Sequence, residues 1–413
     1  MIPQLLSPAG SFDCLAAALK NGANAVYFGV GKLNMRGHAT ANFRPEDLSE
    51  VVLRCHVANA KAWLTLNTLI YDEELEEAKK LCSMASVAGV DAIIAADPAV
   101  ILMARELGLS VHLSVQANVC NIQSLKYHAQ FADTIVLARE LALRQIERIC
   151  CQIQEQHICG PSGDLIKIEV FAHGALCMSV SGQCYLSQAT FNRPASRGEC
   201  FQNCRRRYLI KDDEDGTEFA VDGRYVLSPK DLCTIEIIDR LADAGVSVLK
   251  IEGRGRSADY VAHVTKAYRE ALDFMAVGKK PSFEQKQEWK KSLREVFNRG
   301  FWEGGYYLGE PIEKWGDNSH NQAILQKECV GTVLHYYPKA QIAEVRLTAG
   351  SLALGDRILI TGNTTGAVET ILAELQVHDK KASNAEKGDQ PTFPIADKVR
   401  PKDKVYKLKE VKR

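Results

Sequence analysis

Short hydrophobic runs that end in small or polar residues alternate with amphipathic segments along the first 254 residues of the chain. Between the runs, segments such as 11–22 and 48–60 carry apolar residues at the spacing of a helix. Near-continuous apolar strands that alternate with helices predict a parallel sheet covered on its outside, and eight such units predict a (β/α)8 barrel. A doubly wound open sheet is the alternative, but no Gly-x-Gly-x-x-Gly loop follows the first run. The eight runs are residues 4–10, 25–30, 62–68, 92–97, 111–118, 134–140, 168–174 and 248–254.

The hydrophobic pattern changes near residue 329, where short strand-like runs separated by turn residues replace the alternation with helices. Five such runs, without helices between them, predict a small antiparallel barrel. They are residues 329–337, 340–347, 355–362, 366–375 and 404–410. We therefore expect an α/β protein with a TIM-like barrel over residues 1–320 and a small C-terminal β-barrel over residues 321–413. An insertion of about residues 175–247 follows the seventh strand of the larger barrel.

Polar residues follow the ends of the predicted barrel strands. In a (β/α)8 barrel the loops after the C-terminal strand ends form the active site, so we expect these side chains to converge on one mouth. For any single position, a turn residue or a helix cap is the simpler interpretation. The strand-end residues are Ser7, Asn67, Asp97, Gln116, Asn118, Arg139, Glu140, His173, Glu252 and Arg254.

Four of the 13 cysteines gather in one segment that leaves the seventh strand and is rich in Gly, Ser, Asn and Arg. They are Cys177, Cys184, Cys200 and Cys204, with the spacing Cys-x6-Cys-x15-Cys-x3-Cys. Four thiolates on flexible backbone favour an iron–sulfur cluster. Zinc is the second candidate, although only the last pair has a short zinc-knuckle spacing, and ordinary buried packing is the third. Cys233 is an alternative ligand, but its apolar neighbours favour packing.

Charge is balanced over the whole chain, with 51 basic and 51 acidic residues and a formal net charge of zero. Any polyanion site must therefore be local. One candidate is the triplet Arg205, Arg206 and Arg207, which either binds phosphate or forms a solvated face. The other is a basic C-terminal edge, which either suits an RNA backbone or protects an exposed strand from aggregation. Its residues are Lys398, Arg400, Lys402, Lys404, Lys407, Lys409, Lys412 and Arg413.

No hydrophobic run approaches the roughly 18 to 20 residues that cross a bilayer, and the N-terminal residues lack signal-peptide features. We therefore expect a cytoplasmic protein with no membrane or DNA partner. In a reducing compartment its cysteines are expected as thiols or metal ligands rather than disulfides. The Gly- and aromatic-rich segment 297–311 is interpreted as a packed connector, with a stacking platform for bases as the alternative.

Three motifs that stand in order in this chain resemble the collagenase-like peptidase family (a peptidase U-family). They are HGALCMSVSGQCYLS from His173, RGECFQNCRRRY from Arg197 and KIEGR from Lys250. Further matching stretches are SPAG, YFGVGKLNMRG, LNT, SVQAN, LARELAL and FNRGFWEGGYY. The resemblance thus extends over nearly the whole chain.

The resemblance implies hydroxylation chemistry rather than proteolysis. Bacterial groups of this family hydroxylate wobble uridine of tRNA in a prephenate-dependent way, a cytidine of ribosomal RNA, or ubiquinone precursors. Several carry a [4Fe–4S] cluster on four cysteines, and the family motifs place these ligands at Cys177, Cys184, Cys200 and Cys204. The tRNA group fits best, because it combines one barrel of this length with a small C-terminal barrel. The expected partners are tRNA, prephenate as co-substrate, and an electron donor or partner protein.

Strand-end residues supply the remaining candidate roles. Arg36, Arg139 and Arg254 are expected to bind the two carboxylates of such a co-substrate. His173 and Glu252 are expected to carry protons, with Arg139 as the third catalytic candidate. Further substrate contacts are expected from Asn67, Gln116, Asn118, Arg205 and Arg206.

Other functional classes give different expectations. A non-catalytic scaffold would bind a cluster and RNA but form no product, and a structural zinc protein would contain no iron. A peptidase is disfavoured, because no Ser/His/Asp constellation is identifiable and a Cys nucleophile would have to come from the cluster ligands.

Overall fold

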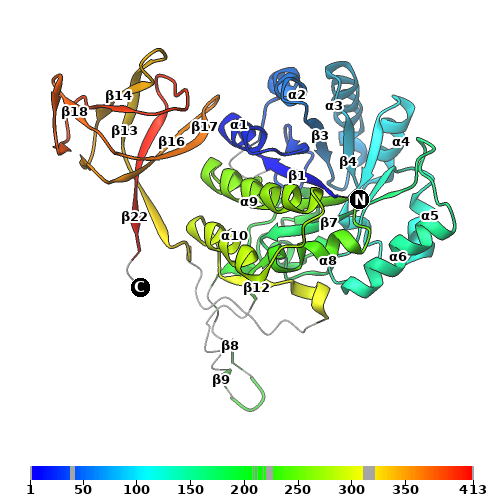
Figure 1. The fold of residues 1–413 in the computed structure, drawn as a ribbon. Coiled ribbons are helices and arrows are strands. Elements are labelled where there is room, and N and C mark those ends of the chain that lie inside the picture. The colour runs from blue at the N-terminus through cyan, green and yellow to red at the C-terminus, as the bar shows by residue number, and fades with distance from the viewer. Residues whose placement is uncertain are drawn as a thin grey trace.

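A large helix-covered barrel and a smaller sheet domain make up the chain in a computed structural model (Figure 1). The structure describes residues 2–37, 42–206, 208, 210–211, 213–216, 218–219, 227–309 and 321–411. Arg207, Lys412 and Arg413, which the sequence placed in two basic clusters, lie outside the described residues.

The larger domain is a closed barrel of eight parallel strands. The strands are β1 (Gln4–Ala9), β2 (Ala25–Gly29), β3 (Lys61–Leu66), β4 (Ala92–Ala95), β5 (Ser110–Leu113), β6 (Thr134–Val136), β7 (Lys167–Gly174) and β11 (Val248–Ile251). Each strand pairs with its neighbour, and β11 closes the ring by pairing with both β1 and β7. All eight predicted runs form these strands, so the (β/α)8 barrel is confirmed.

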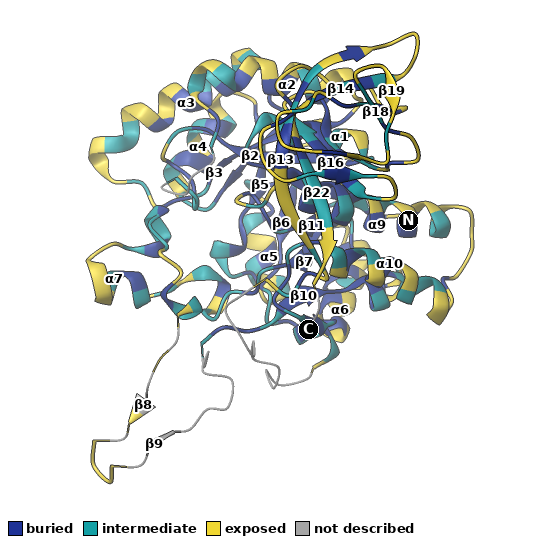
Figure 2. Ribbon diagram, turned by 90° about the vertical axis from the view of Figure 1, so that its left-hand side faces the viewer, coloured by how far each residue is buried: buried dark blue, intermediate teal, exposed yellow. Residues whose placement is uncertain are grey.

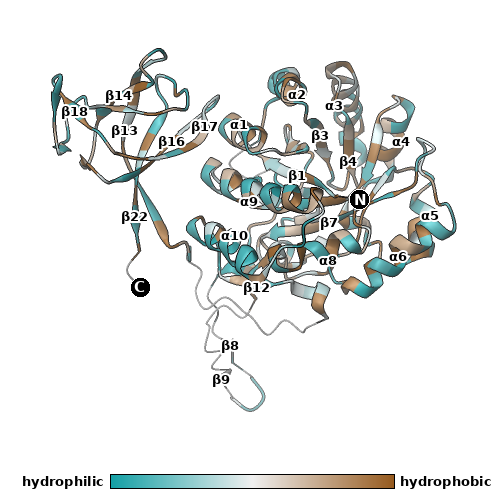
Figure 3. Ribbon diagram, in the orientation of Figure 1, coloured by the Kyte–Doolittle hydropathy of each residue, from teal (hydrophilic) through white to brown (hydrophobic). Residues whose placement is uncertain are grey.

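Helices cover the outside of the barrel. They are α1 (Phe12–Lys20), α2 (Leu48–Val57), α3 (Leu75–Ala88), α4 (Pro98–Glu106), α5 (Ile122–His128), α6 (Leu143–Glu155), α8 (Ile238–Asp243), α9 (Ala258–Ala276) and α10 (Phe283–Glu295). Their inward faces pack on the strands, and Figure 3 shows hydrophobic strands surrounded by helices of mixed hydropathy (Figure 3). The expected strand-end residue Asp97 caps α4 by accepting from the Ala99 amide at 2.8 Å, so it serves the helix rather than the mouth.

The barrel interior holds an apolar cluster and, at the same levels of the strands, three buried polar side chains. A separate buried cluster fills the interior; its members are Leu6, Ala25, Tyr27, Trp63, Ala92, Ile94 and Val248. Beside it lie three buried polar side chains, His112, Glu169 and Lys250. Because parallel strands alternate their side chains between the two faces, these residues point inward while their neighbours face the helices.

The predicted insertion leaves β7 and returns to the barrel at β11. It contains 3₁₀ turns at Val180–Gly182, Ala195–Arg197, Asn203–Arg205 and Ile235–Ile237, the short helix α7 (Leu186–Phe191), and the strands β8 (Ile210–Lys211), β9 (Glu218–Phe219) and β10 (Asp231–Cys233). Strand β10 runs antiparallel to β7 and pairs with β12 (Phe301–Glu303). Trp302 and Tyr307 are buried beside this pair, so residues 297–309 form a packed connector, and the last two residues of the predicted segment lie outside the described residues.

The C-terminal domain is an antiparallel sheet in the order β17-β16-β22-β13-β14-β21-β18-β19, with a separate pair β15–β20. The five predicted strands appear as β13 (Leu325–Tyr337), β14 (Ile342–Leu347), β16 (Arg357–Gly362), β17 (Gly366–Ile371) and β22 (Lys404–Glu410). Short strands complete it: β15 (Leu352–Ala353), β18 (Gln376–Val377), β19 (Lys380–Lys381), β20 (Asn384–Ala385) and β21 (Thr392–Pro394).

The two domains meet where β17 packs against α1 and α9. A Cβ atom at Gly366 would lie 2.8 Å from the Ala17 amide nitrogen, so glycine is required for this close approach. The Lys20 ammonium donates to the Thr365 carbonyl at 2.8 Å across the same boundary. No helix in the described part of the chain is long and apolar enough to span a membrane.

Candidate active site

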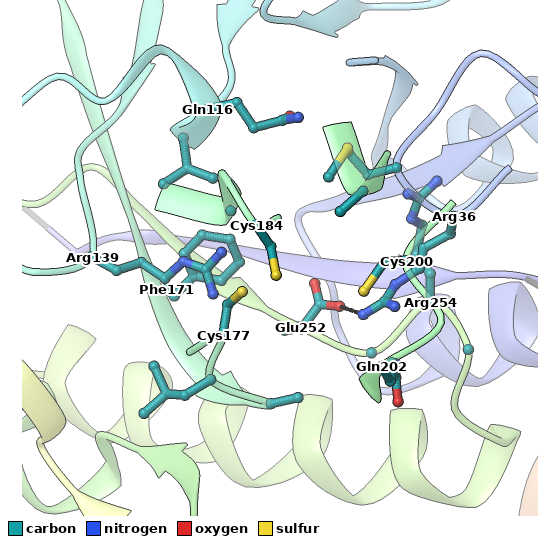
Figure 4. Close-up of a pocket in the computed structure, with 18 of the residues that line it drawn as sticks. Arg36, Gln116, Arg139, Phe171, Cys177, Cys184, Cys200, Gln202, Glu252 and Arg254 are labelled. Carbon is teal, nitrogen blue, oxygen red and sulfur yellow. Dashed lines mark hydrogen bonds and ion pairs between the residues drawn. The ribbon is translucent and has the colours of Figure 1, made fainter. Parts of the chain in front are cut away.

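A cavity of about 470 Å³ opens at the C-terminal ends of the barrel strands, where the insertion closes over them (Figure 4). Among the sequence-predicted residues, its lining brings together Cys177, Cys184, Cys200, Cys204, Arg36, Asn67, Gln116, Arg139, Arg205, Glu252 and Arg254. Six predicted residues are not part of the lining: Ser7, Asp97, Asn118, Glu140, His173 and Arg206. Of the ten strand-end residues, five therefore converge on the mouth and five do not.

The four cysteines share this cavity. Cys177, Cys184 and Cys200 direct their sulfur atoms into it in Figure 4, and Cys204 also lines it. Burial raises the pKa of the Cys184 thiol, and the nearby Cys177 and Cys200 raise it further. Burial also raises the pKa of Cys204, and the other three cysteines add to this effect against the opposing charge of Arg205. The four thiols are thus close enough for their charges to affect one another.

The spacing of these thiols bears on the kind of metal group they fit. Across the described residues, no three His, Cys, Asp or Glu side chains are close enough together to hold a single metal ion. A lone zinc ion draws its sulfur ligands to about 2.3 Å from one centre. In a [4Fe–4S] cluster each thiolate binds a different iron, so the sulfur atoms stand farther apart. Four cysteine side chains in one cavity are the donor set that a [4Fe–4S] cluster uses.

Strand-end residues anchor the cysteine-bearing insertion. The Ser181 hydroxyl donates to Asn118 Oδ1 at 2.8 Å, and the Ser181 amide donates to Glu140 Oε1 at 2.9 Å. On the other side, Arg205 Nη1 donates to Ser228 Oγ and to the Pro229 carbonyl, both at 2.8 Å. Asn118 and Arg205 therefore position the insertion. Arg206 is exposed, and its guanidinium lies 5.4 Å from the Phe191 ring centroid.

Glu252 is the one carboxylate among the lining residues, and it pairs with Arg36. Arg36 Nη2 lies 3.3 Å from Glu252 Oε1, and the Tyr27 hydroxyl donates to Glu252 Oε2 at 3.2 Å. Burial raises the pKa of Glu252, but Arg36, Arg254, Arg139 and Lys250 together bring it below its ordinary value. Glu252 therefore stays ionised at neutral pH, which differs from the expectation that its pKa is tuned for proton transfer.

Arg254 is held by neutral partners. Its Nη1 donates to Thr65 Oγ1 at 2.8 Å and to Asn34 Oδ1 at 3.0 Å. Burial lowers the pKa of Arg254 to about 10, which still leaves it charged at neutral pH. A Cβ atom at Gly29 would collide with the Arg254 guanidinium, so glycine at the end of β2 makes room for it.

Arg139 presents its guanidinium beside the Phe171 ring, 4.9 Å from the centroid. Its Nε is buried and has no hydrogen-bond partner among the described residues. A buried donor without a partner costs free energy, so this group is suited to bind an acceptor on a ligand. Asn67 and Gln116 complete the polar lining, and they accept from the Met35 amide at 3.2 Å and the Ser114 hydroxyl at 2.9 Å.

Lys250 is a cavity residue that the sequence did not single out. Its ammonium is buried and bonds Glu169 Oε1 at 2.9 Å on the neighbouring strand. It also lies 4.6 Å from the Tyr27 ring centroid. Lys250 belongs to a strongly basic lining, which holds seven cationic side chains in all. They are Arg36, Arg139, Arg205, Lys250, Arg254, Arg256 and Arg299. Such a lining favours an anionic ligand.

His173 is not brought to the cavity. It is 2% exposed and packs among the rings of Tyr260, Tyr268 and Phe301, with centroid distances of 6.1, 5.6 and 5.5 Å. Burial lowers its pKa to about 3, with a smaller contribution from Arg256. A neutral histidine enclosed by aromatic rings is poorly placed to exchange protons with a substrate, contrary to the sequence-based expectation.

The structure also bears on two further alternatives, Cys233 as a cluster ligand and the basic C-terminal edge as an RNA surface. Cys233 is fully buried on β10 and is absent from the cavity lining, as packing predicts. At the basic C-terminal edge, Lys407 pairs with Asp356 at 2.6 Å and Lys409 pairs with Glu328. Part of the charge of that edge is therefore neutralised by acidic neighbours on the same domain.

Comparison with known proteins places these features in a family. Residues 10–317 match the sequence pattern described as Peptidase family U32. A protein of Porphyromonas gingivalis named collagenase is 43% identical over 407 residues, which are 98% of this chain and 97% of that protein. A tRNA hydroxylation protein of Bacillus subtilis is 31% identical over 387 residues, covering 90% of this chain and 87% of that protein. A 23S rRNA 5-hydroxycytidine synthase of Escherichia coli is 38% identical over 274 residues, which are 65% of this chain and 39% of that protein.

Proposed function

The chain belongs to peptidase family U32, and on that premise we propose that it is an RNA-modifying enzyme that hydroxylates wobble uridine of tRNA at C5. The names of two relatives, a tRNA hydroxylation protein and an rRNA hydroxycytidine synthase, support RNA hydroxylation as the reaction class. The observation that carries the proposal is one cavity lined jointly by four cysteines and seven basic side chains.

We propose that Cys177, Cys184, Cys200 and Cys204 hold a [4Fe–4S] cluster. Their shared cavity supports this assignment, as does the contribution of neighbouring cysteines to the raised pKa of Cys184 and Cys204. A cluster bound by four thiolates is anionic, and the surrounding guanidinium groups would offset its charge. When bound, such a cluster supplies single-electron transfer, which the side chains of the cavity do not provide.

The basic residues of the lining suit a dicarboxylate, and we propose prephenate as the co-substrate. Arg139 has an unpartnered Nε in the lining, and Lys250 and Arg254 lie in the same cavity. Guanidinium groups bind carboxylates through paired hydrogen bonds, so they orient as well as attract such a ligand. Arg36 is already paired with Glu252, so its proposed role is to position that carboxylate.

Each protein group then has a limited task in the proposed reaction. Conversion of uridine to 5-hydroxyuridine replaces a C5–H bond with C5–OH. With water as the source of the oxygen atom, the conversion releases two electrons and two protons, so it requires a redox partner that accepts the electrons. Glu252, which stays ionised, holds Arg36 and Tyr27 in place and accepts hydrogen bonds at the cavity wall. Gln116 and Asn67 present amide groups that match the donor and acceptor edge of a uracil.

Nucleoside mass spectrometry of RNA from a deletion strain tests the proposed substrate. We expect 5-hydroxyuridine derivatives to disappear from tRNA and to return when the intact gene, but not its Cys177→Ser variant, is restored. A normal tRNA profile with loss of 5-hydroxycytidine from ribosomal RNA would instead assign the cytidine reaction. Unchanged tRNA and ribosomal RNA would overturn RNA hydroxylation.

The peptidase name of the family defines the main competing function. The cavity lining contains no histidine among the residues that the structure describes, so no Ser–His or Cys–His pair forms there. A collagen or gelatin cleavage assay on the purified protein tests this directly. Cleavage that survives Cys177→Ser would establish a peptidase. A non-catalytic scaffold would bind cluster and RNA yet give no hydroxylated nucleoside in a reaction with purified components.

A further inference from the structure

Exposed aromatic side chains are concentrated beside the cavity. Eight exposed aromatic residues occur in the part of the chain that the structure describes, and four of them lie between residues 185 and 208. They are Tyr185, Phe191, Phe201 and Tyr208, with exposed fractions of 74%, 41%, 50% and 39%. All belong to the insertion, and Figure 2 places its helix α7 at the edge of the molecule (Figure 2). A cluster of exposed rings marks a recognition surface.

Phe191, Phe201 and Arg206 lie together at one end of the short helix α7, and Tyr185 stands at its other end. We name these four residues the aromatic rim. The Phe191 and Phe201 rings meet edge to face, with centroids 5.2 Å apart. The Arg206 guanidinium lies 5.4 Å from the Phe191 centroid. The backbone holds this arrangement, because the Phe201 amide donates to the Ser187 hydroxyl at 3.1 Å.

The aromatic rim adjoins the cavity through the chain itself. Tyr185 follows Cys184 directly, and Phe201 stands between Cys200 and Gln202. Those three neighbours all line the cavity. A molecule resting on the rim is therefore within a residue or two of the cavity wall.

The charge of this segment selects the kind of partner. Residues 175–209 contain five arginines and one glutamate, with no lysine or aspartate. Arg193 pairs with that glutamate, Glu199, at 2.8 Å, and Arg197 pairs with Glu74 at 2.6 Å, so the exposed Arg206 supplies the positive charge at the rim. Aromatic rings interleaved with arginines are the combination that binds unpaired nucleic acid, because rings stack on bases and guanidinium groups contact phosphates.

We propose that the aromatic rim stacks the unpaired bases of an RNA hairpin loop, so that one adjacent base can enter the cavity. This rests on the proposed function for the identity of the polymer as RNA. Bases in a duplex already stack on one another and hide their faces, so the rim discriminates loops from paired stems. Extrusion of one base into a cavity is least costly from a loop, where no base pair has to be broken.

Fluorescence anisotropy with a labelled RNA hairpin tests the rim directly, with a blunt RNA duplex of equal length as the comparison ligand. The Phe191→Leu/Phe201→Leu double variant keeps apolar contact but lacks flat ring faces. We expect it to bind the hairpin about tenfold more weakly or worse. Phe283→Leu, at an exposed ring that begins α10, is the matched control and should bind as the unchanged protein does.

A second variant keeps the test decisive if the double variant folds poorly. Tyr185 is the most exposed ring of the rim, so Tyr185→Leu is expected to weaken hairpin binding while leaving thermal unfolding unchanged. Unchanged hairpin affinity in the folded rim variants, or equal affinity for hairpin and duplex, would overturn the proposal. Binding of a gelatin peptide that requires the rim, without hairpin binding, would assign the surface to a peptide and also overturn it.

The rim and the proposed reaction can fail separately. Rim-dependent hairpin binding by a protein that forms no hydroxylated nucleoside would support the rim as an RNA-binding surface and contradict the proposed hydroxylation. Normal hydroxylation in cells by the rim variants, together with normal hairpin binding, would support the proposed reaction and contradict the proposed role of the rim.

Discussion

Arg36 Nη2 lies 3.3 Å from Glu252 Oε1 in the wall of the cavity that the four cysteines also line. The pair joins the loop after β2 to the end of β11, two strands that are separated in the barrel only by β1. Burial lowers the pKa of Arg36, but the Glu252 carboxylate raises it above its ordinary value overall. Both groups therefore stay charged, and the pair fixes the position of each.

Neutralising Glu252 should impair the reaction without unfolding the protein. Glu252→Gln keeps the size of the side chain but removes the charge that holds Arg36, and displaced groups in an active site commonly cost about 100-fold in rate. Restoration of 5-hydroxyuridine in a deletion strain, measured as initial rate after induction, checks this. Glu106→Gln, at an exposed glutamate that ends α4, is the control. Full activity in Glu252→Gln would show that the reaction does not require the charge of this carboxylate.

Each of the four cysteines should be required for iron. Protein purified without air is expected to be brown and to contain about four irons per chain. Cys177→Ser and Cys204→Ser should lose most of that iron and its visible absorbance, because a hydroxyl is a poor replacement for a thiolate ligand. Cys120→Ser, at an exposed free cysteine, should retain both. Iron-free wild-type protein, or full iron in the Cys177 and Cys204 variants, would contradict the cluster assignment.

Lys250 and Glu169 should be coupled in stability. Lys250→Met leaves Glu169 buried without its partner, and breaking a buried ion pair in this way costs about 3 to 5 kcal/mol in the free energy of unfolding. The double variant Lys250→Met/Glu169→Leu removes both charges, so it should recover much of that loss. Urea unfolding of the two variants measures the difference. A double variant that is no more stable than Lys250→Met would show that the two charges are not coupled.

The barrel could be predicted from the sequence because its strands are buried on both faces. The run 92–97 is apolar up to residue 96 and forms β4 at Ala92–Ala95, with Asp97 as the cap of the next helix. Arg254 and Glu252 were found because they follow an apolar run at the end where a barrel places its site. The four cysteines were found because their density in a polar segment is unlike core packing.

Side-chain direction and long-range pairing could not be predicted in the same way. Lys250 and Glu169 lie inside apolar runs and are 81 positions apart, so only the strand pairing reveals their contact. His173 was expected in the mouth from its place at the end of a strand. The register of β7 against β11 shifts after Lys250, which pairs with Phe171, while Ile251 pairs with His173. The extra residue in β7 breaks the inward and outward alternation, and His173 packs among aromatic rings instead.

The ion-pair partners of surface charges also could not be predicted from the sequence. The basic C-terminal edge suggested an RNA surface, but Asp356 and Glu328 lie on other strands and neutralise Lys407 and Lys409. Segment 297–311 has five aromatic residues in 15 positions, and segment 185–208 has four in 24. The first group is packed because β12 pairs with β10, which itself pairs with the barrel strand β7, whereas the second group is exposed.

His263 should make the contact between the two domains depend on pH. Its Nε2 lies 2.7 Å from Glu369 Oε1 on β17, and Arg357 Nη2 bridges Glu369 and Glu295 at 2.6 Å each. Burial lowers the pKa of His263, but Glu369, Glu295 and Asp259 raise it above its ordinary value overall. Because the folded-state pKa is raised, the stabilisation is fully present below the unfolded-state pKa and is lost as pH rises through the folded-state pKa.

The variant His263→Gln separates this effect from other titrations. Glutamine still donates to Glu369 but carries no charge at any pH, so it should lower the free energy of unfolding by about 1 to 2 kcal/mol at acidic pH. The difference from the unchanged protein should shrink above neutral pH, where His263 itself is neutral. Glu369 has a lowered pKa, so its own contribution is lost only at more acidic pH. Thermal unfolding across about pH 5.5 to 8.5 measures the difference. A difference that is constant over this range would show that His263 has the same pKa in the folded and unfolded states, and that its charge does not stabilise the contact between the domains.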